Sequence, residues 1–462
     1  MWKIACIAVA TLITAGARAD STPHLDGHVE TDPRTGSIRG DLCVSNLPPM
    51  KQTVFLLNRG LNIREVRDRA SSKVLDYDGF YDAKGVGDAT RYTVDGIGSG
   101  GLCVSFTGAF PVYRVDAGER SAIDWKGQIA FDGHTIRAAE QTRFYPVVLD
   151  PAGAALEKVS YRLDVACTSC KTIYVNGAPP QRGPKATFVS ETPHSLLLYA
   201  GDFPFAAKQS VYFVGVPVTD TDAEAIRAGV RSIAEAESSY VGAAYSGEPV
   251  FLTFASVSRT RTIGRTSWQF VTWPTIALDG RVDFSTLLEE KDGRRVFPAD
   301  IYIAHEMAHF YFGTRFVPRG PLKWFLLEST AEFVAMKANG VLHGDAAYVD
   351  ELRKHVHEAL QAGDITPLDA VTDAEQIGDT YRYRVGPLLL IALERYAGAN
   401  VVQSLLHSFV VDSPTDEPSY AMFRARLEAA GAAKEAIDRF ERDCLHTPLV
   451  SGCLTRLDER QR

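Results

Sequence analysis

The chain has 462 residues, which at roughly 100 to 200 residues per domain allows two or three domains, each with its own core. Its 49 basic and 57 acidic residues give a formal net charge of −8, and they form no long block of one sign, so binding to nucleic acid or to an anionic membrane surface is not expected. No apolar run after the first residues approaches the roughly 18 residues of a transmembrane helix, so we also expect no membrane span.

The first 19 residues have the pattern of a secretory signal peptide. Lys3 precedes an apolar run over residues 4–15, and Ala-Arg-Ala at residues 17–19 matches an A-x-A cleavage site. We therefore expect residues 1–19 to be removed and the mature chain to begin at Asp20. Such a protein would be exported, either to a periplasm or out of the cell.

Short β-type runs dominate residues 20–218. Segments such as TVFLLN, LCVSFTG, VSYRLDVAC and VYFVGVPV alternate with Gly, Pro, Asn and Asp. Strands of this length with such punctuation are typical of an all-β domain or β-sandwich. Signals for helices are nearly absent there, so the sequence predicts an N-terminal all-β domain that ends near residue 218.

The periodicity changes after residue 218. Thr221 and Glu224 match a capping box at the start of a helix, and apolar residues follow at helical spacing. A strand-rich patch, PVFLTFASV and SWQFVTWPTIAL, then precedes further helical segments. We expect an α/β domain over residues 219–398 and a short helical region over residues 399–462. The whole chain would then belong to the α+β multidomain class.

Seven cysteines are present, and six remain after the predicted removal of Cys6 with the signal peptide. An even number in an exported protein favours disulfides, although the spacing alone cannot choose among the many possible pairings. If neighbours within a domain pair, the bonds are Cys43 to Cys103, Cys167 to Cys170, and Cys444 to Cys453. The CTSC segment could instead be half of a zinc site, but no second Cys or His pair lies at finger-like spacing.

The segment HEMAH places two histidines four residues apart on a predicted helix. Positions i and i+4 share one helix face, so His305 and His309 can direct both imidazoles at one metal ion, with Glu306 beside them. A catalytic zinc needs a third protein ligand. Glu328 follows His309 after 18 residues, in the helical segment KWFLLESTAEF. The alternative is a buried core helix whose two histidines have ordinary partners.

This spacing resembles the HExxH-x18-E signature of the M1 metallopeptidases, a family of the gluzincin group. The resemblance extends to Phe-Gly at 312–313 and to the aromatic pair Trp-Phe at 324–325. It implies an N-terminal β-domain joined to a thermolysin-like catalytic domain. The change of periodicity near residue 218 agrees with that layout.

The resemblance also implies roles for individual residues. His305, His309 and Glu328 would hold one Zn²⁺ per chain, and Glu306 would be the general base in the hydrolysis of a peptide bond. The family also carries Tyr-x-Lys-Gly downstream, and its tyrosine donates a hydrogen bond to the tetrahedral oxyanion. Tyr383 matches that tyrosine here.

The match around Tyr383 is incomplete, because Gly386 stands at the family spacing but Val385 replaces the lysine. Pro387 would clash with the carbonyl of Tyr383 in a continuous helix, so we expect a helix to begin near Pro387 and Tyr383 to lie in the turn before it. Tyr381 is the alternative donor, and Tyr383 would then be a packed core residue.

The chain departs from the family at the site that binds the substrate amine. The G-x-M-E-N motif is absent, since no glutamate lies between Glu248 and Glu289, and the expected edge strand reads GRTSWQFVTW. That strand could still bind a peptide backbone by β-augmentation. Glu140 and Gln141 are candidates for a second amine anchor, or they are ordinary solvated residues.

Three further residues lie near the motif in sequence. Glu332 follows Glu328 by one helical turn and either orients a ligand histidine or is an exposed or capping carboxylate. His355 and His357 are two residues apart on a predicted helix and are expected at the surface.

The sequence therefore predicts an exported zinc metallopeptidase, with M1-like aminopeptidase activity and relaxed recognition of the substrate N-terminus. The alternative is a non-catalytic module that keeps this scaffold and binds peptides or proteins. Glu306 favours the enzyme, because a purely structural zinc site needs no general base and usually has four protein ligands.

Overall fold

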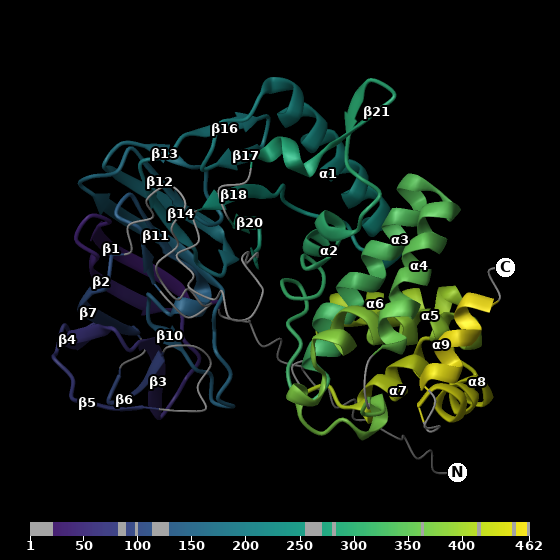
Figure 1. Ribbon diagram of the computed structural model, residues 1–462. Helices are drawn as coiled ribbons and strands as arrows, with labels where there is room; N and C mark the ends of the chain where they lie inside the picture. Colours follow the sequence, from purple (N-terminus) through teal and green to yellow (C-terminus); the bar gives the residue numbers. More distant parts are fainter. Residues whose placement is uncertain are drawn as a thin grey trace, which may run out of the picture.

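A strand-rich N-terminal part is followed by a largely helical C-terminal part, which confirms the predicted α+β class (Figure 1). The computed structural model describes residues 22–81, 89–97, 100–112, 129–254, 270–279, 283–361, 365–413, 417–445 and 450–459. The predicted signal peptide lies outside the described residues, and so do residues 264–269 of the expected edge strand.

Three sheets share one core in the N-terminal part. Burial alternates along the strands, as in SIRGDLCVS, so that one face of each strand packs inward. The first sheet contains, in spatial order, β14 (Lys185–His194), β11 (Val159–Cys167), β1 (His24–Asp32), β2 (Ser37–Ser45), β7 (Leu102–Ala109) and β4 (Leu61–Asp68). The second contains β10 (Val147–Val148), β3 (Gln52–Asn58), β6 (Ala89–Asp95) and β5 (Tyr77–Tyr81). The third contains β13 (Gln181–Arg182), β12 (Thr172–Val175), β15 (Leu198–Gly201), β9 (Thr135–Ala138) and β8 (Ala130–Phe131).

A further sheet connects the two parts of the chain. Its order is β16 (Phe205–Lys208), β17 (Val211–Val214), β18 (Val250–Phe254), β20 (Thr275–Asp279) and β19 (Phe270–Thr272). Strands β17, β18 and β20 are parallel, and β19 pairs with β20 in the antiparallel sense at the edge. Because β16 and β17 precede residue 218, strands on both sides of the predicted boundary share this sheet. The division into domains at residues 218 and 398 stays a prediction.

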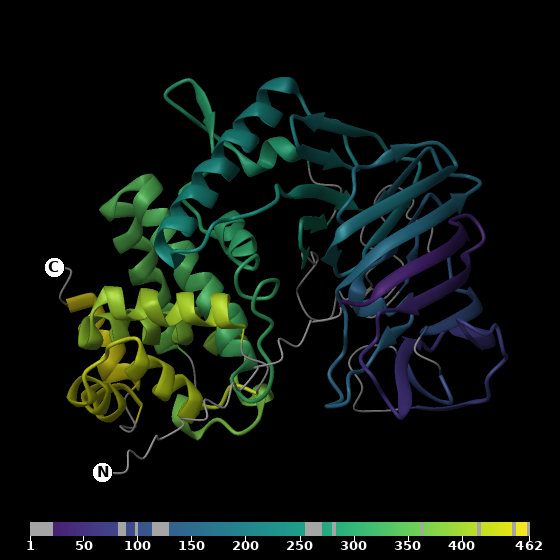
Figure 2. The same ribbon diagram turned by 180° about the vertical axis from the view of Figure 1, so that it is seen from behind.

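Helices form most of the remaining chain, on the side opposite the sheets in both views (Figures 1 and 2). The helices are α1 (Asp220–Val241), α2 (Tyr302–Ala308), α3 (Thr330–His343), α4 (Asp345–Leu360), α5 (Gly386–Ala397), α6 (Ala399–Asp412), α7 (Tyr420–Ala429), α8 (Lys434–Phe440) and α9 (Val450–Glu459). A hairpin of β21 (Glu289–Lys291) and β22 (Arg294–Val296) precedes α2. Among the described residues, no helix has both the length and the apolar character needed to cross a membrane.

Short helical turns complete the secondary structure. Three of them are π-helical, namely η4 (Phe325–Ser329), η7 (Tyr381–Val385) and η8 (Glu441–Leu445). The others are the 3₁₀ turns η1 (Glu140–Thr142), η3 (Phe284–Leu287), η5 (Leu368–Ala370) and η6 (Ala374–Gln376). The turn η4 leads directly into α3 and η7 leads directly into α5, so each helix begins with a widened turn.

The first long helix begins where the sequence periodicity changes, but its cap differs from the prediction. Thr219, not Thr221, is the N-cap residue, and its side chain accepts a hydrogen bond from the N–H of Asp222 at 3.1 Å. Glu224 forms an ion pair with Arg227 one turn along instead of closing a capping box. Thr219 precedes the first helical residue and is extended, which is the conformation that an N-cap requires.

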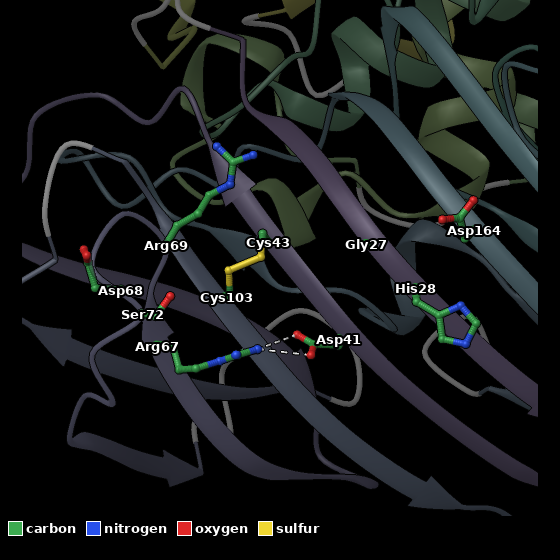
Figure 3. A pocket seen from close by; sticks show the side chains of 10 residues that line it. All are labelled: Gly27, His28, Asp41, Cys43, Arg67, Asp68, Arg69, Ser72, Cys103 and Asp164. Atoms are coloured by element: carbon green, nitrogen blue, oxygen red, sulfur yellow. Dashed lines mark hydrogen bonds and ion pairs between the residues drawn. A yellow bond between two sulfur atoms is a disulfide. The ribbon is translucent and has the colours of Figure 1, made fainter.

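Disulfides join the cysteines in the neighbouring pairs that the sequence suggested. Cys43 and Cys103 face each other across β2 and β7, beside the ion pair of Arg67 and Asp41 in a surface pocket (Figure 3). The other bonds are Cys167 to Cys170 and Cys444 to Cys453. The alternative that CTSC is half of a zinc site is therefore wrong.

Alkylation should confirm that these three bonds form in solution. We expect an iodoacetamide-type reagent to label none of the six cysteines in a purified chain that starts at Asp20, under denaturing and non-reducing conditions. Reduction before alkylation should label all six, which is the control. Two or more labelled thiols without reduction, located by peptide mass spectrometry, would contradict the pairing.

Candidate active site

Helix α2 carries both histidines of the HExxH segment. The helix starts where the side chain of Asp300 accepts a hydrogen bond from the N–H of Tyr302 at 3.0 Å. His305 lies in the last turn, and His309 ends the helix with dihedral angles that are still helical, φ −63° and ψ −11°. The two imidazoles therefore stay on one face, and their ring centroids lie 4.9 Å apart.

The predicted third ligand reaches the same point from η4. The Oε2 atom of Glu328 lies 3.4 Å from Nε2 of His305 and 3.4 Å from Nε2 of His309. All three ligand atoms lie within 4.8 Å of one another. Two imidazole nitrogens and one carboxylate oxygen are a donor set that suits Zn²⁺ and leaves a fourth position for substrate or water. The residues present thus fit the metal that the sequence implies.

Each histidine is held in the orientation that a metal ligand needs. Nδ1 of His305 donates to Oε2 of Glu332 at 2.7 Å, and Nδ1 of His309 donates to the carbonyl of Phe312 at 3.0 Å. These bonds favour the tautomer in which Nε2 carries a lone pair. Of the two predicted roles of Glu332, the structure supports the orienting one, since this carboxylate is buried against His305.

The buried carboxylates of the site are anionic. Burial opposes charge on Glu328, but the charges and hydrogen bonds of His309 and His305 hold the pKa of its carboxyl well below the usual range. Burial also opposes charge on Glu332, and hydrogen bonds from His305 and His355 lower its pKa to about 2. A buried pair of negative carboxylates beside two imidazoles favours a cation at this place.

Glu306 and Tyr383 lie beside the ligand group. The ring of Tyr383 lies 5.7 Å from the ring of His305. Burial raises the pKa of the Tyr383 hydroxyl, and the charges of Glu328 and Glu306 raise it further, so the hydroxyl keeps its proton at neutral pH. Tyr381 is also buried, and burial raises the pKa of its hydroxyl. The charge that raises this pKa further is that of Asp369, not that of the site carboxylates. The geometry favours Tyr383 over Tyr381, and the catalytic roles stay proposals.

As predicted, an α-helix begins near Pro387, since α5 starts at Gly386 and carries Pro387 in its first turn, but the turn before it is π-helical. Tyr383 lies within η7, which is continuous with α5, and in this wider turn the N–H of Gly386 bonds to the carbonyl of Tyr381. The carbonyl of Tyr383 accepts a hydrogen bond from Nη1 of Arg384 at 2.7 Å. Because Pro387 has no N–H, the side chain of Arg384 supplies this carbonyl with a donor.

The prediction that His355 lies at the surface is also wrong. His355 is 0% exposed, and its Nε2 lies 2.9 Å from Oε1 of Glu332. A signal was present, because Leu352, Val356 and Ala359 recur at helical spacing and His355 falls on their face of α4. His357 is exposed, as predicted.

Glu140 is not a solvated residue. It is 8% exposed, and one carboxylate oxygen accepts a hydrogen bond from the hydroxyl of Thr272 on the edge strand β19. Burial raises the pKa of this carboxyl, which the bond to Thr272 partly offsets. Glu140, one of the two candidates for the amine anchor, is therefore hydrogen-bonded to the edge strand that would bind substrate. Gln141, the other candidate, is half-buried.

Comparison with known proteins identifies the fold. No protein-family model matches the sequence, and no curated protein matches it. Among solved structures, leukotriene A4 hydrolase from Saccharomyces cerevisiae is similar with a TM-score of 0.65 at 14% identity, over 92% of this chain and 67% of the hydrolase. The M1 zinc metallopeptidase from Deinococcus radiodurans is similar with a TM-score of 0.59 at 16% identity, over 91% of this chain and 92% of that chain. The chain thus has the multidomain fold of the M1 zinc metallopeptidases.

Replacing the third ligand should remove the metal. We expect Glu328→Ala to lower zinc occupancy strongly, because two imidazoles alone provide an incomplete donor set. The fold should persist, since Glu328 is not itself one of the apolar side chains that form the cores of the chain. Elemental analysis measures the zinc and circular dichroism the fold. Glu235→Ala, at an exposed position of α1, is the matched control. Full zinc retention in Glu328→Ala would remove this residue from the ligand set.

Proposed function

We propose that this chain is an exported zinc-dependent metallopeptidase with M1-like aminopeptidase activity and relaxed recognition of the substrate N-terminus. The observation that carries the proposal is the convergence of His305, His309 and Glu328 on one point, with Glu306 on the same helix as the two histidines. The three disulfides are consistent with a periplasmic or extracellular location.

In this proposal Glu306 and Tyr383 have different roles in the hydrolysis of a peptide bond. When bound, Zn²⁺ would act as a Lewis acid on the scissile carbonyl and lower the pKa of a water molecule to about 7. Glu306, as a carboxylate, takes a proton from the attacking water and passes it to the leaving amine. The hydroxyl of Tyr383 donates a hydrogen bond to the oxyanion of the tetrahedral intermediate.

The position of β19 at the edge of its sheet is one reason to propose a peptide as the substrate. A strand at the edge of a sheet can pair with an extended peptide through backbone hydrogen bonds. Two similar structures hold ligands of this kind, since the yeast hydrolase is known in complex with bestatin and the Deinococcus enzyme with the substrate Tyr-Ser-Ala. Glu140 reaches β19 through Thr272, and we propose Glu140 and Gln141 as the residues that make a minor contact with the substrate amine.

A peptide library tests the proposal. The zinc-loaded chain starting at Asp20 should cleave a mixed library, and a chelator should abolish cleavage until zinc is restored. Mass spectrometry then maps the cleaved bonds in free and N-terminally acetylated peptides. Relaxed N-terminal recognition predicts loss of N-terminal residues from free peptides and only a modest reduction for acetylated ones. Peptide binding without any cleavage would support the non-catalytic module instead.

A further inference from the structure

A second group of charged side chains lies behind the ligand His305. It is centred on Glu332 of α3, which His355 of α4 and Arg384 of η7 both contact. The Oε2 atom of Glu332 accepts from His305, while its Oε1 atom accepts from the other two residues. One oxygen of the buried Glu332 carboxylate therefore binds the metal ligand His305, and the other binds His355 and Arg384.

His355 has a defined place on the far side of Glu332. Its Nε2 atom donates to Oε1 of Glu332 at 2.9 Å, and its Nδ1 atom donates to the backbone carbonyl of Glu351 at 2.9 Å. Burial disfavours charge on this ring, but the hydrogen bonds with Glu332 and Glu351 raise its pKa to about 9. An imidazole whose two nitrogens both face oxygen atoms cannot turn over without losing both bonds.

Arg384 links Glu332 to the segment that carries Tyr383. Its Nη1 atom lies 3.2 Å from Oε1 of Glu332 and 2.7 Å from the carbonyl of Tyr383, and its Nε atom donates to Glu358 of α4. A guanidinium is planar and presents its donors in a fixed fork. One side chain therefore connects the residue behind the ligand His305 with the backbone of the oxyanion donor.

We propose that His355 and Arg384 are positioning residues for the metal centre: they hold Glu332, which holds His305 with Nε2 toward the metal, and Arg384 also anchors the backbone of Tyr383. The inference rests on the zinc site of the proposed function. Without these two donors, Oε1 of Glu332 would be buried and unpaired, which is costly enough to make the carboxylate turn or draw in water. The imidazole of His305 would then lose its fixed orientation.

Zinc affinity tests the role of His355 without reference to catalysis. Loss of a residue behind a metal ligand typically weakens metal binding about 10- to 100-fold. We expect His355→Phe to weaken zinc binding by about that factor and His355→Gln to weaken it less, because the glutamine amide can still donate one bond to Glu332. Competition with a chromophoric chelator measures the affinity. His357→Gln, exposed on the same helix, is the control and should bind zinc as the wild type does.

Arg384→Gln adds a readout that a merely structural role would not move. It should weaken zinc binding and also lower kcat for peptides with little change in KM, because the Tyr383 backbone loses its anchor while the substrate strand is untouched. The visible spectrum of the Co²⁺-substituted protein should change in both Arg384→Gln and His355→Gln, because it reports the geometry of the ligands. Arg353→Gln, exposed on α4, is the matched control.

The outcomes separate this inference from the proposed function. Weakened zinc binding and altered Co²⁺ spectra in a protein that cleaves no peptide would sustain the positioning role and overturn the peptidase. Zinc affinity and Co²⁺ spectra equal to the wild type in His355→Gln and Arg384→Gln, with an active enzyme, would overturn the positioning role alone. If His355→Phe does not fold, His355→Gln decides.

Discussion

Glu306→Gln should leave the zinc and the fold in place and reduce turnover about 10²- to 10⁴-fold, because a positioned general base contributes a factor of that size. The amide has nearly the same shape as the carboxylate but cannot accept a proton from water at neutral pH. Glu306 is not among the three side chains whose ligand atoms converge, so its replacement should not release the metal. Turnover of a peptide found in the library and zinc content by elemental analysis give the two measurements.

The control for this variant is another Glu→Gln change on the protein surface. Glu235→Gln on α1 removes a charge from an exposed ion pair with Arg231 and should leave turnover as it is in the wild type. Cleavage by Glu306→Gln at the wild-type rate would exclude Glu306 as the base. The peptidase proposal would then lose its main support, and a peptide-binding module would take its place.

Tyr383→Phe should lower kcat about 10²- to 10³-fold with little change in KM, because an oxyanion donor strengthens its bond only as negative charge develops. The ring would remain beside His305, so the packing of the site should be preserved. Steady-state kinetics with a single peptide separates the effect on kcat from the effect on KM.

Tyr381→Phe is the matched control for the tyrosine. It removes a hydroxyl two residues away on the same π-helical turn, where no hydrogen-bond partner is found in the described structure. Its kcat should stay close to that of the wild type. The reverse result would be a large loss of kcat in Tyr381→Phe and a small loss in Tyr383→Phe. It would show that Tyr381, not Tyr383, corresponds to the family tyrosine.

The features that the sequence predicted and that the structure also shows depend mostly on local geometry. His305 and His309 meet because any helix brings positions i and i+4 to one face. The disulfides followed from pairing each cysteine with its neighbour along the chain, at separations of 3 and 9 residues for two bonds and of 60 residues for Cys43 and Cys103. The all-β start and the helical end followed from periodicities of two and of 3.6 residues.

The parts that failed depend on packing between distant segments. The apolar face of α4 was a local signal that His355 is buried, but its partners Glu332 and Arg384 lie on segments that are not near it in sequence. The π-helical form of the turn before Pro387 was not predicted, because it depends on the widened backbone of η7 and on the side chain of Arg384, for which periodicity gives no signal. The sheet that runs across residue 218 could not be predicted either, because strand pairing is a long-range property.

The two π-helical turns make the active site sensitive to chain length as well as to side-chain identity. Glu328 lies in η4 and Tyr383 in η7, and each turn contains one residue more than an α-helical turn. Deleting one residue from either turn would rotate the residues before the deletion by about 100° relative to the residues after it. A homologue with an intact HExxH motif but one residue fewer in either turn would thus keep every expected side chain and still fail to assemble the site.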